Sequence, residues 1–242
     1  MKNIKVRNLA LIAVAILAAA SAAHAQDVTF GAAQTISGDS NLIDAADTPG
    51  ITNIDALAVG GGAVAGPVDG VTFNVGLTDG VITLAGLPSQ TNGTFFSGYT
   101  GAGSTNFVSL INSGVAYNSG STGTLTISAA ALTAGDTYEL QIFSDSNDGT
   151  LNTTSFTSNN TVGIQDNDGS FDGVGQFVTG TFVATGSNEV VSISSGVNYS
   201  VVGSVSLVEE AAAVPEPSTY ALMLGGLALL VIQLRRRRHL SS

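Results

Sequence analysis

The central part of the chain, residues 26–210, is predicted to be an all-β sandwich or barrel. Short segments in which apolar and polar residues alternate recur along it, Gly, Asn and Asp separate them, and no long helical periodicity occurs. These three observations are typical of antiparallel sheets that bury one face and expose the other. The length is sufficient for one domain with a full hydrophobic core.

The clearest expected strand is 137–143, because three apolar residues alternate there with Glu139 and Gln141, which we expect to face outward. The other expected strands are 27–35, 71–75, 81–85, 122–128, 175–184, 189–194 and 199–208. The segments 71–75 and 81–85 are expected to form a hairpin across a glycine-bounded turn. The segment 107–111 is expected to be a helical turn.

Residues 1–25 are predicted to be a secretory signal peptide, with a signal helix. Three basic residues precede an uninterrupted apolar run at 9–20. The small residues Ala23 and Ala25 then form a cleavage pattern for signal peptidase, so the mature chain is expected to begin at Gln26.

The other end of the chain is predicted to cross a membrane. A linker at 211–218 leads into an apolar run at 219–234 that contains no charged residue. As a helix this run would span roughly 24 Å, somewhat less than a hydrocarbon core of about 30 Å. The tail at 235–242 begins with four arginines, which places it in the cytoplasm and the body outside. Hydropathy alone favours a permanently anchored single-pass membrane protein.

The order of features in this end resembles the PEP-CTERM sorting signal of Gram-negative bacteria. Val-Pro-Glu-Pro-Ser-Thr is followed by a glycine-containing apolar run and by terminal arginines. The resemblance implies recognition by exosortase, a membrane-embedded cysteine transpeptidase, and removal of the helix. It also implies a precursor anchored in the inner membrane, and a body then placed at the cell surface or outside the cell. The residues assigned to sorting and processing are Val214, Pro215, Glu216, Pro217, Ser218, Arg235, Arg236, Arg237 and Arg238.

The composition of the mature body excludes several kinds of chemistry. All seven Lys and Arg residues and both His residues lie outside 26–234, whereas all 18 Asp and Glu lie within 27–216. The body also lacks Cys and Trp. Triads that need His, thiol nucleophiles, zinc–thiolate sites and lysine Schiff bases are therefore absent. Without cationic contacts to phosphate, nucleic acid is not an expected partner.

Carboxylate chemistry is the one catalytic class that this composition leaves, as in glycoside hydrolysis. The sequence shows no recognisable pair of carboxylates, so we expect no catalytic residues and no enzymatic activity. A carboxylate-dependent glycosidase is the least favoured hypothesis.

A second resemblance covers most of the body. The segments 31–40, 68–73, 132–143 and 175–182 resemble a module found in exported bacterial proteins. The resemblance implies a jelly-roll, galactose-binding-like β-sandwich and does not imply an activity. The loop 144–149 departs from the module because it lacks an Arg that many relatives carry there.

Two acidic loops are the best candidate site in the body. Asp145, Asp148, Asp166 and Asp168 lie on short turns rich in hard oxygen ligands, which Ca²⁺ prefers. Neither loop has the full spacing of a calcium-binding loop, and Asp or Asn before Gly is also ordinary turn chemistry. A calcium site and plain solvated turns both stay open.

The sequence therefore favours a non-enzymatic protein exported to the surface or the extracellular matrix, with exosortase, signal peptidase and the inner membrane as partners. Extracellular polysaccharide is a further candidate partner, and a carbohydrate-binding module is the alternative function. Such modules use exposed aromatic residues, for which Tyr99, Tyr117 and Tyr199 are the candidates. Ice binding would need a flat, regular array of Thr, and the sequence shows no sustained repeat.

Overall fold

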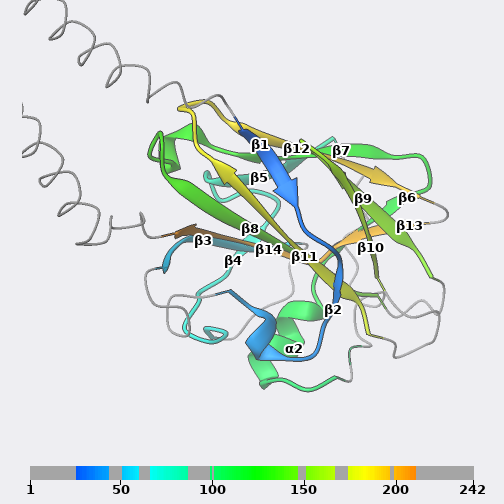
Figure 1. Cartoon of the computed structure of the whole chain (residues 1–242). Coiled ribbons are helices and arrows are strands. Elements are labelled where there is room, and N and C mark those ends of the chain that lie inside the picture. The colour runs from blue at the N-terminus through cyan, green and yellow to red at the C-terminus, as the bar shows by residue number, and fades with distance from the viewer. Residues whose placement is uncertain are drawn as a thin grey trace, which may run out of the picture. The chain divides into compact units, whose positions relative to one another are not determined.

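The computed structural model describes residues 26–43, 51–59, 66–86, 99, 101–146, 151–166, 174–196 and 199–210. Almost all of its regular elements are strands (Figure 1). The strands are β1 (Gln26–Phe30), β2 (Gln34–Thr35), β3 (Ile51–Val59), β4 (Asn74–Gly76), β5 (Ile82–Ala85), β6 (Val115–Asn118), β7 (Thr122–Ile127), β8 (Thr137–Ser144), β9 (Thr153–Thr157), β10 (Thr161–Gln165), β11 (Gln176–Val183), β12 (Glu189–Ser195), β13 (Tyr199–Val202) and β14 (Ser204–Glu210). The helical elements are α2 (Thr105–Ile111) and two 3-10 turns, η2 (Asp39–Asn41) and η3 (Ala129–Ala131).

Two sheets form the sandwich. The larger one has the order β1-β11-β8-β14-β3-β4, with β2 paired to β11, and all its pairs are antiparallel except β3 with β4. The smaller one has the order β10-β9-β12-β7-β5 and is antiparallel throughout. A third, two-stranded sheet pairs β13 with β6. The all-β sandwich predicted from the sequence is confirmed.

The main hydrophobic core lies between the two large sheets, and one cluster of buried side chains joins them. Tyr138, Leu140 and Ile142 of β8 are fully buried in it, as their alternation predicts. Leu125 and Ile127 of β7 reach it from the smaller sheet.

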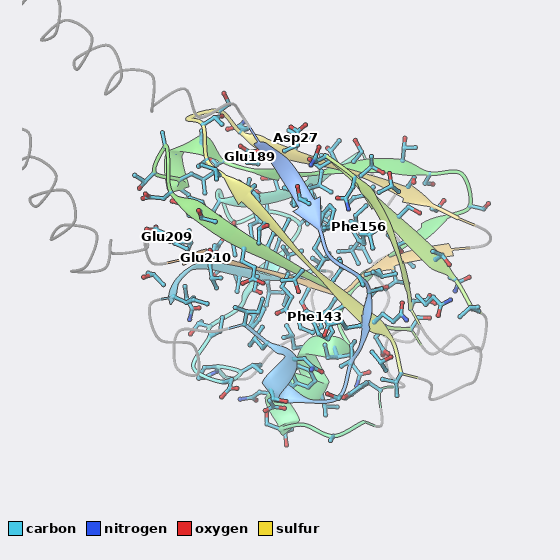
Figure 2. The ribbon with its side chains drawn as sticks, viewed as in Figure 1. Asp27, Phe143, Phe156, Glu189, Glu209 and Glu210 are labelled. Atoms are coloured by element: carbon cyan, nitrogen blue, oxygen red, sulfur yellow. The ribbon has the colours of Figure 1, made fainter. Side chains whose placement is uncertain are left out.

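The larger sheet is covered on its second face as well. A second cluster contains Phe107 and Leu110 of α2 together with Phe143 of β8 and Phe177 of β11. The rings of Phe143 and Phe177 stack at 5.3 Å, and Phe107 meets Phe143 edge-on at 6.3 Å. Figure 2 shows Phe143 beside α2 and Phe156 between the strands of the sandwich.

This second layer corrects the expectation for Gln141, which is buried rather than exposed to water. Its side-chain oxygen accepts a hydrogen bond from the backbone N–H of Ile43 at 3.1 Å, and its amide donates to the carbonyl of Asn41. Glu139, nearer the end of β8, is only half-buried. The outward face of β8 is therefore solvated at one end and covered at the other.

The prediction that 71–75 and 81–85 form a hairpin within one sheet is wrong. A tight turn does form, because the backbone N–H of Leu84 donates to the carbonyl of Leu77 at 2.8 Å. However, β4 pairs with β3 in the larger sheet, whereas β5 pairs with β7 in the smaller one. The segment is a corner that carries the chain from one sheet to the other.

The expected strand at 199–208 is split at Gly203 into β13 and β14, which belong to different sheets. A Cβ atom at Gly203 would lie 3.0 Å from the carbonyl oxygen of Ser113 and 3.3 Å from that of Phe143. Such close approach of three backbone segments favours glycine.

The described residues contain no helix long and apolar enough to cross a membrane. The predicted signal helix at 1–25 and the predicted membrane helix at 219–234 both lie outside the described residues.

We predict that Leu140→Ala lowers the free energy of unfolding by roughly 2–5 kcal/mol, because it removes buried area and leaves a cavity between the sheets. Ile142→Ala is expected to act similarly. Denaturant unfolding measures the change, and Ser192→Ala, on an exposed position of β12, is the control. Unchanged midpoints for both core variants would show that this face of β8 does not contribute to the core.

Candidate functional site

The residues assigned to sorting, 214–218 and 235–238, lie outside the described residues, so their assignment depends on sequence. In the body, the structure describes two of the four aspartates predicted to bind Ca²⁺. Asp145 directly follows β8, and Asp166 directly follows β10. Asp148 and Asp168 lie outside the described residues.

The structure brings the two acidic loops together. The backbone N–H of Ser146 donates to the carbonyl of Asp166 at 2.7 Å, and the Ser146 hydroxyl donates to Oδ2 of Asp166 at 2.8 Å. The backbone N–H and the side-chain amide of Asn152 also donate to the Asp166 carboxylate, at 3.0 and 2.9 Å. Asp166 is thus a fully buried carboxylate that ties three segments to one another.

Asp145 is also buried, and its two oxygens differ. Oδ1 accepts a hydrogen bond from the backbone N–H of Gly175 at 2.8 Å. Oδ2 is buried and has no hydrogen-bond partner among the residues that the structure describes. The pKa of Asp145 is raised to about 8, chiefly by burial and also by the negative charge of Asp166, whereas the hydrogen bond from the Gly175 N–H acts in the opposite direction. At neutral pH this carboxyl keeps a proton unless a cation replaces it.

This arrangement agrees with a cation site and does not establish one. Because the body has no Lys, Arg or His, only a proton or a metal ion can neutralise a second buried carboxylate there. Within the described residues, no group of three or more His, Cys, Asp or Glu side chains is placed to hold a metal ion. The calcium site at Asp145, Asp148, Asp166 and Asp168 therefore stays a prediction.

A second carboxyl pair, which the sequence did not reveal, joins the edge of the larger sheet to the corner after β4. The side-chain amide of Asn74 donates to Oδ1 of Asp55 at 3.2 Å and to Oδ2 of Asp79 at 3.3 Å. The pKa of Asp55 is raised to about 6, chiefly by burial and also by its interaction with Asp79. Oδ2 of Asp55 is buried and has no hydrogen-bond partner among the described residues, so Asp55 is the member of the pair that retains a proton more readily.

Asp79 is the ionised member of the pair. Burial alone would raise its pKa, but hydrogen bonds from Asp55 and from the backbone N–H groups of Ile82 and Val81 lower it. Oδ1 of Asp79 accepts those two backbone bonds at 2.9 and 3.0 Å, which closes the turn before β5. The only hint in the sequence was Asp before Gly80, which is common turn chemistry.

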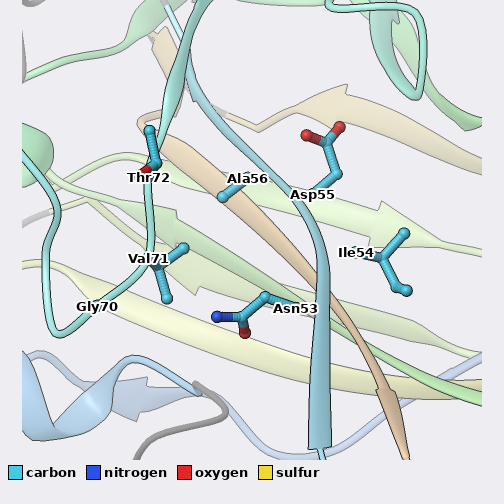
Figure 3. A pocket seen from close by; sticks show the side chains of 7 residues that line it. All are labelled: Asn53, Ile54, Asp55, Ala56, Gly70, Val71 and Thr72. Atoms are coloured by element: carbon cyan, nitrogen blue, oxygen red, sulfur yellow. The ribbon is translucent and has the colours of Figure 1, made fainter.

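An open groove of about 230 Å³ lies beside Asp55 (Figure 3). It is lined by Asn53, Ile54, Asp55, Ala56, Gly70, Val71 and Thr72. The amide of Asn74 bridges the two carboxyls, so hydrogen bonds hold this pair in place beside the groove.

Tyr99 is not a platform for sugar stacking. It is 3% exposed, its ring meets Phe107 edge-on at 6.0 Å, and its hydroxyl donates to the carbonyl of Ala102 at 2.8 Å. Tyr117 and Tyr199 belong to β6 and β13, and their side chains lie outside what the structure describes.

Comparison with known proteins identifies the end of the chain. The family model of the PEP-CTERM protein-sorting motif matches residues 213–238, which include all nine residues assigned to sorting. The chain thus carries a PEP-CTERM motif, which implies an exported protein with a membrane-anchored precursor that exosortase processes.

The similarity of the body to a solved structure is weak. A solved structure, CBM35 from Cellvibrio japonicus Abf62, aligns over 49% of this chain and 87% of its own length, with 14% sequence identity and a TM-score of 0.32. A TM-score of this size supports no assignment of fold family or ligand. No curated protein matches the chain.

We predict that the protein becomes more stable as the pH falls from about 8 towards 5. The pKa of Asp145 is raised from 3.8 to about 8 and that of Asp55 from 3.8 to about 6, so the folded state holds protons that the unfolded chain releases. Stability contributed by these groups is therefore lost as the pH rises through those windows. Thermal unfolding of the purified full-length chain across this pH range measures the effect.

Single variants assign this pH dependence to its groups. Asp145→Asn should flatten the profile up to about pH 8 and Asp55→Asn up to about pH 6, because each removes one titrating carboxyl. Asp69→Asn, in an exposed turn, is the control. A profile of wild type that rises with pH over this range would contradict the prediction.

We predict that Ca²⁺ raises the melting temperature beyond the effect of NaCl at matched ionic strength. An ion that binds only the folded form stabilises it by about 2.7 kcal/mol at a hundredfold excess over its dissociation constant. Asp145→Asn, and separately Asp148→Asn with Asp168→Asn, should remove the increment. Equal melting temperatures in CaCl₂, matched NaCl and EDTA-treated controls would show that hydrogen bonds and protons, without Ca²⁺, hold the two loops together.

Proposed function

We propose that this chain is a non-enzymatic protein of the surface or extracellular matrix of a Gram-negative bacterium. Its PEP-CTERM motif delivers it, and exosortase cleaves it at Pro215-Glu216-Pro217 and separates the β-sandwich from the membrane helix. The observation that carries the proposal is the match of the sorting motif to residues 213–238, in which the proline–acid–proline element, the apolar run and the basic end follow in order.

The body supports a non-enzymatic role in two ways. It has no His, Cys, Lys or Arg for nucleophilic or acid–base work, so only carboxyl groups remain. Of the carboxyl groups that the structure describes, Asp55 of β3 and Asp79 of the turn before β5 both accept hydrogen bonds from the amide of Asn74, and Asp145 and Asp166 are buried between loops. Both pairs hold segments of the fold together, a structural role that requires no substrate.

The alternative is that the apolar run at 219–234 anchors the protein permanently. This alternative differs from the proposal in one measurable property, which is the mass of the exported protein.

We predict that the protein recovered from the cell surface begins at Gln26 and ends near 215–217. Intact mass spectrometry should show this product in a strain with exosortase and a chain that retains the tail in a strain without it. Glu216→Ala should block processing because it removes the acid of the motif, whereas Glu210→Ala, in the last strand, should be processed normally. A retained tail in both strains would establish the permanent anchor instead.

A further inference from the structure

The outer face of the five-stranded sheet carries hydroxyl groups and no charge. Along each strand, residues buried in the main core alternate with exposed or half-buried ones. The hydroxyl side chains on the outer face are Thr83, Thr122, Thr124, Thr126, Thr153, Ser155, Thr157, Thr161, Ser192 and Ser194. The other outward residues are Ala85, Gly163, Gln165 and Val190.

Strand pairing aligns these hydroxyls into rows across the sheet. Thr124 of β7 lies opposite Ser192 of β12, and Ser192 lies opposite Thr157 of β9. Thr157 in turn pairs with Thr161 of β10, and their hydroxyls are 3.0 Å apart. Neighbouring strands are about 4.8 Å apart, so this central row is a continuous line of donors and acceptors across four strands.

None of the residues of the five strands places a carboxylate on this face. The one charged residue in the five strands is Glu189, which is 6% exposed and points to the same side as the core residues Val191 and Ile193. Burial and the neighbouring Asp27 both raise the pKa of Glu189, and Figure 2 shows these two residues close together at one end of the sandwich. An exposed sheet normally mixes charges among its polar residues, and this one excludes them.

We propose that the outer face of the five-stranded sheet is a docking surface for uncharged polysaccharide chains. Hydroxyl groups of Thr and Ser both donate and accept, so they can exchange their bonds to water for bonds to the hydroxyls of a neutral sugar polymer. An anionic polymer is repelled by a body whose only charged side chains are Asp and Glu. The neutral face is where a polymer without charge can approach without removing water from a carboxylate.

The hydroxyl groups and the lack of aromatic rings on this face determine how it would bind a neutral polysaccharide. The face presents no aromatic ring for stacking, so recognition depends on many weak hydrogen bonds along the polymer. We expect modest affinity for each site and little discrimination among neutral sugars, but clear discrimination between neutral and anionic polymers. The proposal rests on the proposed function for delivery outside the cell, and it names the partner of the delivered body.

Two other occupants fit the face less well. A second copy of this chain would need an interface core rich in apolar and aromatic side chains, and Val190 is the one large apolar side chain exposed on this sheet. A crystalline surface such as ice would need a flat array, whereas adjacent strands rotate by roughly 20–25°. A flexible polymer can follow such a twist.

Affinity electrophoresis of the full-length chain, in a detergent without sugar groups, tests the proposal. The gels contain dextran, mannan or hydroxyethyl cellulose as neutral probes, and polygalacturonate as the anionic probe. The row variant Thr124→Val, Ser192→Ala, Thr157→Val removes the central hydroxyls without adding charge. The matched control Thr35→Val, Thr52→Val, Thr181→Val removes three exposed hydroxyls from the other sheet.

We expect at least one neutral polymer to retard the parent and the control, with an affinity at least fivefold weaker for the row variant. Any retardation by polygalacturonate, which the basic ends of the full-length chain can bind, should be equal for all three proteins. Melting temperatures show that all three proteins are folded. The proposal is overturned if no neutral polymer retards the parent, or if the row variant and the control bind alike. It is also overturned if the row variant loses dimerisation in sedimentation or ice shaping instead. Affinity electrophoresis measures polymer binding, whereas intact mass measures processing at the sorting motif. A negative result in one experiment therefore does not contradict the proposal that the other one tests.

Discussion

The absence of every cationic side chain from the mature body is the constraint on which the rest of the structure depends. A buried carboxylate must be neutralised or hydrogen-bonded, and this body has only protons, amides, hydroxyls and metal ions to offer. Protons, amides and hydroxyls serve this purpose in the part of the chain that the structure describes. Asp166 accepts hydrogen bonds from Ser146 and Asn152, Asp55 and Asp79 both accept hydrogen bonds from the amide of Asn74, and burial raises the pKa values of Asp55 and Asp145 so that they retain protons. Oδ2 of Asp145 is buried and has no hydrogen-bond partner among the described residues, so it is the oxygen that a metal ion would neutralise.

The carboxyl groups sit where the chain passes between layers. Asp55 and Asp79 hold the corner that carries the chain from β4 in the larger sheet to β5 in the smaller one. Asp145 and Asp166 bring the ends of β8 and β10, strands of different sheets, into contact. Exported proteins often secure such junctions with disulfides, but this chain has no Cys. Hydrogen bonds and protonated carboxyls serve that purpose here, which is why we predict that stability depends on pH.

The outer faces of the two sheets differ in how far they are buried. The second face of the larger sheet packs against α2 and its aromatic neighbours, and Gln141 on this face is buried. The outer face of the smaller sheet stays open and carries hydroxyls without charge. The charged residues that the structure describes lie in loops and in the larger sheet, except Glu189, which is on the core side of β12, so the outer face of the smaller sheet differs from the rest of the described surface.

The sequence by itself located β5, β7, β8, β11 and β12, indicated which residues of β7 and β8 enter the core, and excluded several chemistries, because alternation and composition are local properties. It did not predict β3, β6, β9 or β10. It also identified the sorting motif from Val214 to Arg238, which the family model matches at 213–238. It could not assign strands to sheets, so 71–75 and 81–85 were expected as a hairpin and 199–208 as one strand. Only long-range pairing decided that β4 and β5 separate, that Gly203 divides two strands, that Asp55 meets Asp79, and that the hydroxyls of β7, β12 and β9 form one row. The physical reason is that a strand's own pattern reports whether a face is buried, whereas the identity of the neighbour that covers or continues that face depends on residues far along the chain.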